Sequence, residues 1–401
     1  MFEPTDLPQP PVTRPLACVP QPLTRAAVLG AGAWGTALAA ALQRAGVATT
    51  LWARRADRAH HLNTTHRTDV LPGVALPSGL RATHHLATAV EAAQVVLFAV
   101  PASATRELAC QVAGLLAPGT LVLSASKGFE PESGAFMTEV LDDTLGHSIF
   151  TGVLSGPSFA LGVAQGDPTL LTLAMAALDH GHPKRRLVQR QADALARALA
   201  LAHLRVESTP DVIGAQVGGA LKNQIAIACG MATALELGEN ARAGILSRGL
   251  DDMRRLTLAL GGRAETLLGS CGVGDLFLTA ASPQSRNTRL GMRLAGGATG
   301  IACEQDELAE GAFSARTVAR LEDRLGIRLD LAAAVRDVLD GVRTPAEALA
   351  GLLEPRTHAL PRPRPATPPA PPPDLPALLR PFDRTRKARP AQAHSGESSH
   401  V

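Results

Sequence analysis

Short apolar runs alternate with an alanine-rich stretch near the start of the chain. Residues 25–29 (RAAVL) form the first run, the alanine-rich stretch extends to about Ala45, and residues 47–52 form a second run after Gly46. Short apolar runs bounded by glycine predict β-strands, whereas the alanine-rich stretch predicts a helix. A strand, a helix and a strand within about 30 residues are typical of a parallel sheet.

Three further apolar runs extend this predicted sheet. They cover residues 94–100, 121–124 and 148–154, and each is followed closely by proline, serine or glycine. In an open α/β sheet, ligands bind beyond the carboxyl ends of the parallel strands. We therefore expect the segments that follow the predicted strands to meet in one crevice. These segments centre on Gly32, Pro101, Lys127 and Ser155.

The second half of the chain predicts helices. Residues 208–211 (STPD) are typical of a helix start, because a hydroxyl cap, a proline and an early acid occur together. Residues 212–235 follow with a single charged side chain, Lys222. A membrane span is the alternative, but Lys222 and its polar neighbour Asn223 would be costly in lipid. We therefore expect a buried helix in a soluble domain.

Composition and charge narrow the class of protein. The chain has 401 residues, of which 46% are hydrophobic and 19% are charged, so it can bury a large core. Aromatic residues make up only 3%, and the net charge of +3 comes from the C-terminal tail, so we expect no nucleic-acid partner. Five widely spaced cysteines without a C-x-x-C pair indicate a reducing compartment and no metal site. We also expect no signal peptide.

Residues 30–35 (GAGAWG) match the pattern G-x-G-x-x-G between the first predicted strand and helix. Gly30 and Gly32 permit a tight turn and close approach of a pyrophosphate, and Gly35 lets the helix pack on the strand. The helix N-terminus attracts the anion. The motif predicts a dinucleotide site on a Rossmann-like sheet, and a plain glycine-rich turn is the alternative.

These patterns together predict the fold class, which is an α/β Rossmann-like parallel sheet followed by an all-α C-terminal domain, with disordered proline-rich tails. Prolines number 7 in the first 24 residues and 12 in the last 47, but only 11 in the 330 residues between. The expected parts are a tail over 1–24, a nucleotide-binding domain over 25–207, a helical substrate domain over 208–354 and a tail over 355–401.

The end of the second predicted strand bears on cofactor choice. NAD enzymes usually place an acid there to bind the ribose hydroxyls. This strand instead ends at Arg54 and Arg55, and the first acid is Asp57. Because paired arginines attract a 2′-phosphate, we predict a preference for NADP(H). The alternative is that one or both arginines are solvated surface residues.

Lys222 is unusual in two respects. It lies in an apolar stretch, and it is one of only 4 lysines in a chain with 35 arginines. A buried lysine must find partners or lose its proton, and a chain that otherwise uses arginine has placed a titratable amine here. Such an amine suits general acid–base chemistry near neutral pH. The alternative is a structural lysine whose charged end reaches the surface.

Two later segments carry groups that suit a phosphate ester or its surroundings. Residues 272–275 (GVGD) place an acid after a flexible turn, with Thr279 four residues on. Residues 285–287 (SRN) offer a hydroxyl, a guanidinium and an amide in a turn-like run, and such groups bind phosphate. Taken alone, each segment is equally well explained as a solvated loop.

Seven motifs in order resemble bacterial NAD(P)-dependent glycerol-3-phosphate dehydrogenases. They are GAGAWGTALA (30–39), SKG (126–128), SGPSFA (155–160), GGALKN (218–223), NARA (240–243), GVGDL (272–276) and SRN (285–287). The resemblance covers about residues 25–353. It implies a two-domain cytoplasmic enzyme that reversibly reduces dihydroxyacetone phosphate to sn-glycerol 3-phosphate for glycerophospholipid synthesis. NADP(H) would be the cofactor, and NAD(H) would also be accepted.

The resemblance also implies roles for individual residues. Lys222 matches the proton-transfer group, with Asn223, Asp275 and Thr279 beside it. The substrate would contact Lys127, Gly156, Ser158, Lys222, Asp275, Ser285, Arg286 and Asn287. The nucleotide would contact Gly30, Gly32, Ala33, Trp34, Gly35, Arg54, Arg55, Lys127, Ala160, Arg286, Leu308 and Glu310. The chain departs from the family pattern at Ala33, where serine is frequent, and at Leu161–Gly162, where a Lys-Glu pair is common.

Two other classes compete with this interpretation. A ketopantoate or hydroxyacid reductase also uses a helix lysine and an asparagine, but it would take non-phosphorylated ketoacids and would not need Lys127 and residues 285–287 arranged for a phosphate. A cofactor-sensing or scaffold protein would bind NADP(H) without chemistry, and the intact pair of Lys222 and Asp275 argues against it. The sequence does not give the oligomeric state, and a homodimer is compatible with it.

Overall fold

The computed structural model describes residues 22–297 and 310–355. The predicted tails lie outside these residues, except for residues 22–24 and 355. All the elements below belong to one compact unit that ends at Glu354. The division into domains at residue 207 stays a prediction, and the last strand of the sheet runs two residues beyond that point.

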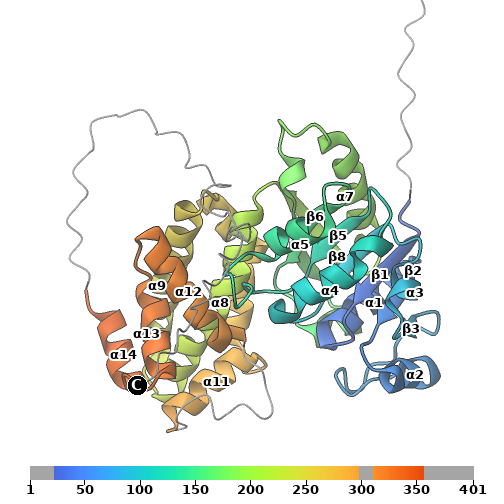
Figure 1. Cartoon of the computed structure of the whole chain (residues 1–401). Helices are drawn as coiled ribbons and strands as arrows, with labels where there is room; N and C mark the ends of the chain where they lie inside the picture. Colours follow the sequence, from blue (N-terminus) through green and yellow to red (C-terminus); the bar gives the residue numbers. More distant parts are fainter. Residues whose placement is uncertain (1–21, 298–309, 356–401) are drawn as a thin grey trace, which may run out of the picture. The chain divides into compact units, whose positions relative to one another are not determined.

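The first part of the chain is built on a sheet of eight strands in the order β3-β2-β1-β4-β5-β6-β7-β8 (Figure 1). The strands are β1 (Arg25–Leu29), β2 (Ala48–Trp52), β3 (Arg81–Thr83), β4 (Val95–Phe98), β5 (Leu121–Ser124), β6 (Phe150–Ser155), β7 (Thr169–Ala174) and β8 (Leu204–Thr209). The helices between them are α1 (Ala33–Arg44), α2 (Ala56–Thr65), α3 (Leu86–Val90), α4 (Thr105–Val112), α5 (Met137–Leu145), α6 (Ala160–Gln165) and α7 (Arg185–Ala200). This confirms the predicted Rossmann-like sheet.

Apolar side chains on both faces of the strands explain why the sheet lies between two layers of helices. On β1, Ala26 and Val28 join the core formed with α1 and α7, whereas Ala27 and Leu29 join the core formed with α3, α4 and α5. Successive side chains of a strand point to opposite faces, so a continuous apolar run can fill both cores. The strand order reverses between β1 and β4, which creates the crevice where nucleotides bind in such sheets.

The second part of the chain consists of helices packed around one central, buried helix, α8 (Figure 1). The helices are α8 (Val212–Ala234), α9 (Gly238–Ala259), α10 (Asp275–Ala281), α11 (Arg286–Ala295), α12 (Glu310–Leu325), α13 (Asp330–Leu339) and α14 (Pro345–Leu353). Because its neighbours surround α8, this helix is apolar on nearly every side. Among the described helices, none has the length and hydropathy needed to cross a bilayer.

Glycines let α8 and α11 touch through their backbones. A Cβ atom on Gly230 would lie 2.0 Å from the carbonyl oxygen of Thr288, and one on Gly291 would lie 2.0 Å from that of Ile227. Real side chains cannot be accommodated at such distances. The contact brings the first turn of α11, with Asn287, against the middle of α8.

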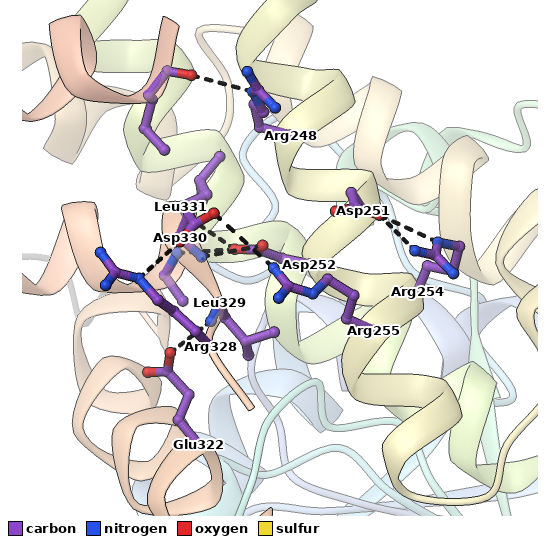
Figure 2. A network of polar contacts seen from close by, with 12 residues as sticks. Arg248, Asp251, Asp252, Arg254, Arg255, Glu322, Arg328, Leu329, Asp330 and Leu331 are labelled. Carbon is purple, nitrogen blue, oxygen red and sulfur yellow. Dashed lines mark hydrogen bonds and ion pairs between the residues drawn. The ribbon is translucent and has the colours of Figure 1, made fainter. Parts of the chain in front are cut away.

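A buried carboxylate on α9 fixes the start of α13. The side chain of Asp252 accepts hydrogen bonds from the backbone N–H groups of Asp330 (3.2 Å) and Leu331 (2.8 Å) (Figure 2). It also accepts one from the backbone N–H of Ala332 (3.2 Å). Asp252 thus caps the N-terminus of a helix that is distant in sequence. Burial raises the pKa of this carboxyl to about 7, although the hydrogen bonds from Ala332 and Leu331 act in the opposite direction.

Three expectations from the sequence need correction. The sheet is not wholly parallel, because β7 runs antiparallel to β6. The run expected over 148–154 is a strand over Phe150–Ser155. The hydroxyls of Ser208 and Thr209 do not cap α8, because both residues belong to β8. Asp211 caps the helix instead, since its carboxylate accepts from the backbone N–H of Gly214 at 3.0 Å.

Candidate active site

The turn between β1 and α1 has the backbone of an anion-binding loop. Gly30 has a φ of +119°, and a Cβ there would lie 2.5 Å from the carbonyl oxygen of Ala99. A Cβ on Gly35 would lie 1.9 Å from the carbonyl oxygen of Gly30. The space around Gly32 is open, and α1 begins there without a side-chain cap. The N-terminus of α1 therefore presents uncapped N–H groups to open space, which fits a pyrophosphate.

Helix α6 lies beside this turn. Ala160, its first residue, and Trp34 pack against the same core, and α6 contacts α1. Arg44 at the end of α1 donates to the carbonyl oxygens of Val163 and Ala164, both at 2.9 Å. This fork ties the end of α1 to α6.

The departure at Leu161–Gly162 has a structural consequence. A Cβ on Gly162 would lie 2.6 Å from a carboxylate oxygen of Asp167, so Asp167 occupies the space beside the glycine backbone. The backbone N–H of Asp167 also donates to the carbonyl oxygen of Gly162 at 2.9 Å. A glutamate at position 162 would therefore displace Asp167.

The two arginines after β2 are exposed. Arg55 forms an ion pair with Asp57, the first acid after the strand. Since β2 neighbours β1, both arginines lie at the same edge of the sheet as the glycine-rich turn. Their contact with a 2′-phosphate stays a prediction.

The amine of Lys222 is buried and bonded to two side chains of α10. Its Nζ donates to Oδ1 of Asp275 at 2.6 Å and to Oγ1 of Thr279 at 2.8 Å. Side-chain exposure is only 8% for Lys222 and 1% for Asp275, so this lysine does not reach bulk water. Asp275 and Thr279 are four residues apart on α10 and therefore share a face. The alternative of a lysine whose end reaches the surface is wrong.

A second lysine binds the same carboxylate. The Nζ of Lys127, which follows β5, lies 2.7 Å from Oδ2 of Asp275 and donates to the carbonyl oxygen of Gly156 at 2.9 Å. Asp275 thus gives one oxygen to each ammonium. The segments after β5 and β6 meet α8 and α10 at this point, which confirms the expected convergence of Lys127 with the segment at Ser155.

Two amides continue the cluster. Asn287 Nδ2 donates to Oδ1 of Asn223 at 3.1 Å, and the backbone N–H of Gly311 donates to Oδ1 of Asn287 at 3.0 Å. Residues 285–287 are a helix start and not the expected turn-like run. The hydroxyl of Ser285 accepts from the backbone N–H of Thr288 at 3.3 Å as the cap of α11, while Arg286 is exposed.

Three further residues were expected to contact the substrate or the nucleotide, and the structure describes two of them. The hydroxyl of Ser158 donates to the carbonyl oxygen of Gly156 at 2.9 Å. Glu310 begins α12, and Leu308 lies outside the described residues. Ser155 was expected in the crevice but not among the residues that contact a ligand. Its hydroxyl is buried and has no hydrogen-bond partner among the described residues.

Two models of one protein family match the chain. The model for the N-terminus of NAD-dependent glycerol-3-phosphate dehydrogenase matches residues 25–180, and the model for its C-terminus matches residues 211–350. The chain belongs to the NAD-dependent glycerol-3-phosphate dehydrogenase family. The matched residues include Lys127, Lys222 and Asp275, so the buried cluster lies within the family's sequence.

Individual relatives of the family agree with this assignment. A glycerol-3-phosphate dehydrogenase of Stenotrophomonas maltophilia, named for NAD(P)+, is 43% identical over 330 residues, which are 82% of this chain and 94% of that protein. One from Rhodospirillum rubrum is 44% identical over 332 residues, 82% of this chain and 91% of that protein. The crystal structure of a glycerol-3-phosphate dehydrogenase from Coxiella burnetii has a TM-score of 0.76 at 33% identity, covering 83% of this chain and all of that one.

Proposed function

We propose that this chain reduces dihydroxyacetone phosphate to sn-glycerol 3-phosphate with NADPH or NADH, in a reversible reaction. The observation that carries the proposal is the buried cluster in which Lys222 and Lys127 share Asp275. This reaction needs an amine that transfers a proton and cationic groups that bind a phosphate. The names of the relatives agree with the proposal.

The glycine-rich turn fits a dinucleotide. Gly30 and Gly35 allow backbone contacts that no side chain would permit, and the open space at Gly32 faces the uncapped N-terminus of α1. We assign the pyrophosphate to this turn and the adenosine end to the edge at Arg54 and Arg55. When bound, the nicotinamide supplies the hydride that reduces the ketone carbon.

Lys222 is the proton donor in this proposal. As the ketone carbon is reduced, negative charge grows on the carbonyl oxygen, and a proton from Lys222 Nζ neutralises it. Asp275 and Thr279 hold the amine in a fixed direction, because both accept its hydrogen bonds. Asn223 and Asn287 are bonded to each other, so their amide groups are also fixed before substrate arrives.

The phosphate of the substrate is assigned to Lys127, Arg286 and Asn287. Lys127 donates one hydrogen bond to the carbonyl oxygen of Gly156 and forms an ion pair with Asp275, and Arg286 is exposed at the N-terminus of α11. Anions are stabilised near the N-terminus of a helix, and charge-assisted bonds to phosphate are strong. This assignment separates the chain from reductases of non-phosphorylated ketoacids.

A substrate panel tests the proposal. Oxidation of NADPH by the purified chain is followed with dihydroxyacetone phosphate, with dihydroxyacetone, and with ketopantoate and other 2-ketoacids. We expect turnover with dihydroxyacetone phosphate and a loss of at least about a hundredfold in kcat/KM without the phosphate. Faster turnover of a ketoacid would replace this function with that of the competing reductases.

We further propose a cytoplasmic location, a homodimer and a role of the product in glycerophospholipid synthesis. The described cysteines, Cys110, Cys229 and Cys271, are free thiols, which suits a reducing compartment.

Leu268 and Phe277 are large apolar side chains that remain exposed close to Asp275 in sequence, which supports a partner surface for the homodimer. Light scattering on the purified chain tests the dimer, and the mass of a single chain would contradict it.

A further inference from the structure

Lys127 stands on a loop that reaches into the helical part of the chain. The loop covers residues 126–136 and connects β5 to α5; we call it the Lys127 loop. Phe129 and Phe136 pair across it in an isolated antiparallel bridge, with ring centroids 5.2 Å apart. Both rings are buried in the core formed around α8. These two rings therefore tie the loop to the helices of the second part of the chain.

A partly buried ion pair fixes the middle of this loop. Nε of Arg106, on α4, lies 2.6 Å from Oε1 of Glu130, and its Nη2 lies 2.9 Å from Oε2. The side chain of Glu130 is only 10% exposed, and the hydroxyl of Ser133 also donates to it. The Arg106 guanidinium holds the pKa of the Glu130 carboxyl below its usual range. A two-pronged Arg–carboxylate contact restricts orientation as well as distance.

A second arginine fixes the tip of the loop from α12. Arg320 donates to the backbone carbonyl oxygens of Pro131 and of Glu132, the latter at 3.4 Å. At its other end, α12 donates the backbone N–H of Gly311 to Asn287. One helix therefore contacts both the loop that carries Lys127 and the amide that is bonded to Asn223.

We propose that Arg106 and Glu130 are positioning residues that hold Lys127 in place for the phosphate of the substrate. The inference rests on the proposed function. A lysine is a point charge on a flexible four-carbon stem, so the direction of its ammonium depends on how firmly its backbone is held. Glu130 is three residues from Lys127, and its ion pair ties this backbone to α4. Small misplacements of a binding group are costly in rate.

A double-mutant cycle tests whether Glu130 acts through Lys127. In Glu130→Gln, we expect kcat/KM for dihydroxyacetone phosphate to fall about tenfold, mainly through KM. In the Lys127→Ala background, the same substitution has no further effect, because the group that it positions is gone. Equal effects in both backgrounds, or no effect in either, would overturn the inference.

A measurement without turnover separates this inference from the proposed function. The chain has only four lysines, so the rate of amine acetylation can be followed at Lys127 and at Lys184 by peptide mass spectrometry. We expect Lys127 to react several-fold faster in Glu130→Gln than in the wild type, relative to the exposed Lys184. An unchanged ratio of the two acetylation rates would overturn the inference, even if the enzyme is active. A raised ratio in a chain that does not reduce dihydroxyacetone phosphate would overturn only the proposed function.

Glu322→Gln is the matched control. The side chain of Glu322 is also 10% exposed and lies 3.0 Å from Nη1 of Arg336. The substitution weakens another partly buried Arg–carboxylate contact, so we expect it to lower stability by a similar amount. We expect it to leave KM and the acetylation of Lys127 as in the wild type. Equal changes in both variants would mean that Glu130 has only a general structural role, which overturns the inference.

Discussion

At the scale of single side chains, we propose that Lys222 carries the proton transfer. Its amine is buried against Asp275 and Thr279, so it is already directed when substrate binds. We predict that Lys222→Ala lowers kcat by about two to four orders of magnitude. Lys222→Arg should be similarly inactive, because a guanidinium keeps its proton. Initial-rate kinetics, with circular dichroism to check the fold, measure both variants, and activity like that of the wild type would refute the role.

Two exposed arginines determine the choice of nucleotide in our account. Arg54→Asp combined with Arg55→Ser should abolish any advantage of NADPH over NADH, since an acid repels the 2′-phosphate. The ratio of kcat/KM for the two nucleotides measures the effect. If this ratio is unchanged, the arginines do not recognise the 2′-phosphate and are solvated surface residues.

The sequence identified candidate site residues such as Lys222, but it did not identify the side chains with which they form hydrogen bonds and ion pairs. Lys222 was identifiable because a lysine in a long apolar stretch must find partners or lose its proton. The sharing of Asp275 by Lys222 and Lys127 was not identifiable, because the two lysines are 95 positions apart and the contact exists only once β5 and α8 are packed. The hydroxyl of Ser285 caps α11, a local use that a serine before a helix commonly has, and its contact with substrate stays a prediction.

At the scale of elements, the contact between α8 and α11 depends on glycine. Gly291→Ala would place a Cβ 2.0 Å from the carbonyl oxygen of Ile227 and force the helices apart. We predict a loss of about 1–3 kcal/mol in the free energy of unfolding. Gly296→Ala at the end of the same helix is the control, since its Cβ would meet nothing closer than 3.5 Å. Urea unfolding compares the two, and equal stability would show that the close approach is unimportant.

The capping of α13 by Asp252 gives stability a defined dependence on pH. Burial raises the pKa of this carboxyl from 3.8 to about 7, so between these values the unfolded chain loses a proton that the folded chain keeps. This contribution to the free energy of unfolding therefore falls as pH rises from about 4 to about 7, by at most about 4 kcal/mol. The amide in Asp252→Asn cannot titrate. The free energy of unfolding of the wild type minus that of the variant should therefore fall over the same pH range. Urea titrations at several pH values measure it, and a difference that is constant or rises with pH contradicts the prediction.

Local patterns predicted β1, α1, β5 and α8 closely, because each is a short apolar run or a long apolar helix with clear boundaries. They did not predict β7 at all, and its antiparallel direction depends on the connection from β6, which a local pattern does not reveal. The cap of α8 was assigned to the hydroxyls of residues 208 and 209, but these residues complete β8 and Asp211 caps the helix. Pairing with β7 is a long-range contact that a local cap signal cannot reveal.

For the whole molecule, function depends on bringing the sheet's carboxyl edge and the helix α8 to one place. Lys127, after β5, and Lys222, on α8, meet at Asp275, and the glycine-rich turn lies at the same edge of the sheet. Family membership and this geometry lead to the same reaction. We propose that a hydride reaches the ketone carbon of a phosphorylated substrate while Lys222 protonates the carbonyl oxygen.

Transfer of deuterium tests this claim most directly. The purified chain is incubated with dihydroxyacetone phosphate and NADPH that carries deuterium at the transferable position of the nicotinamide, and the product is analysed by NMR and mass spectrometry. The account predicts sn-glycerol 3-phosphate with one deuterium on its central carbon. Absence of this product, or deuterium on any other carbon, would contradict it.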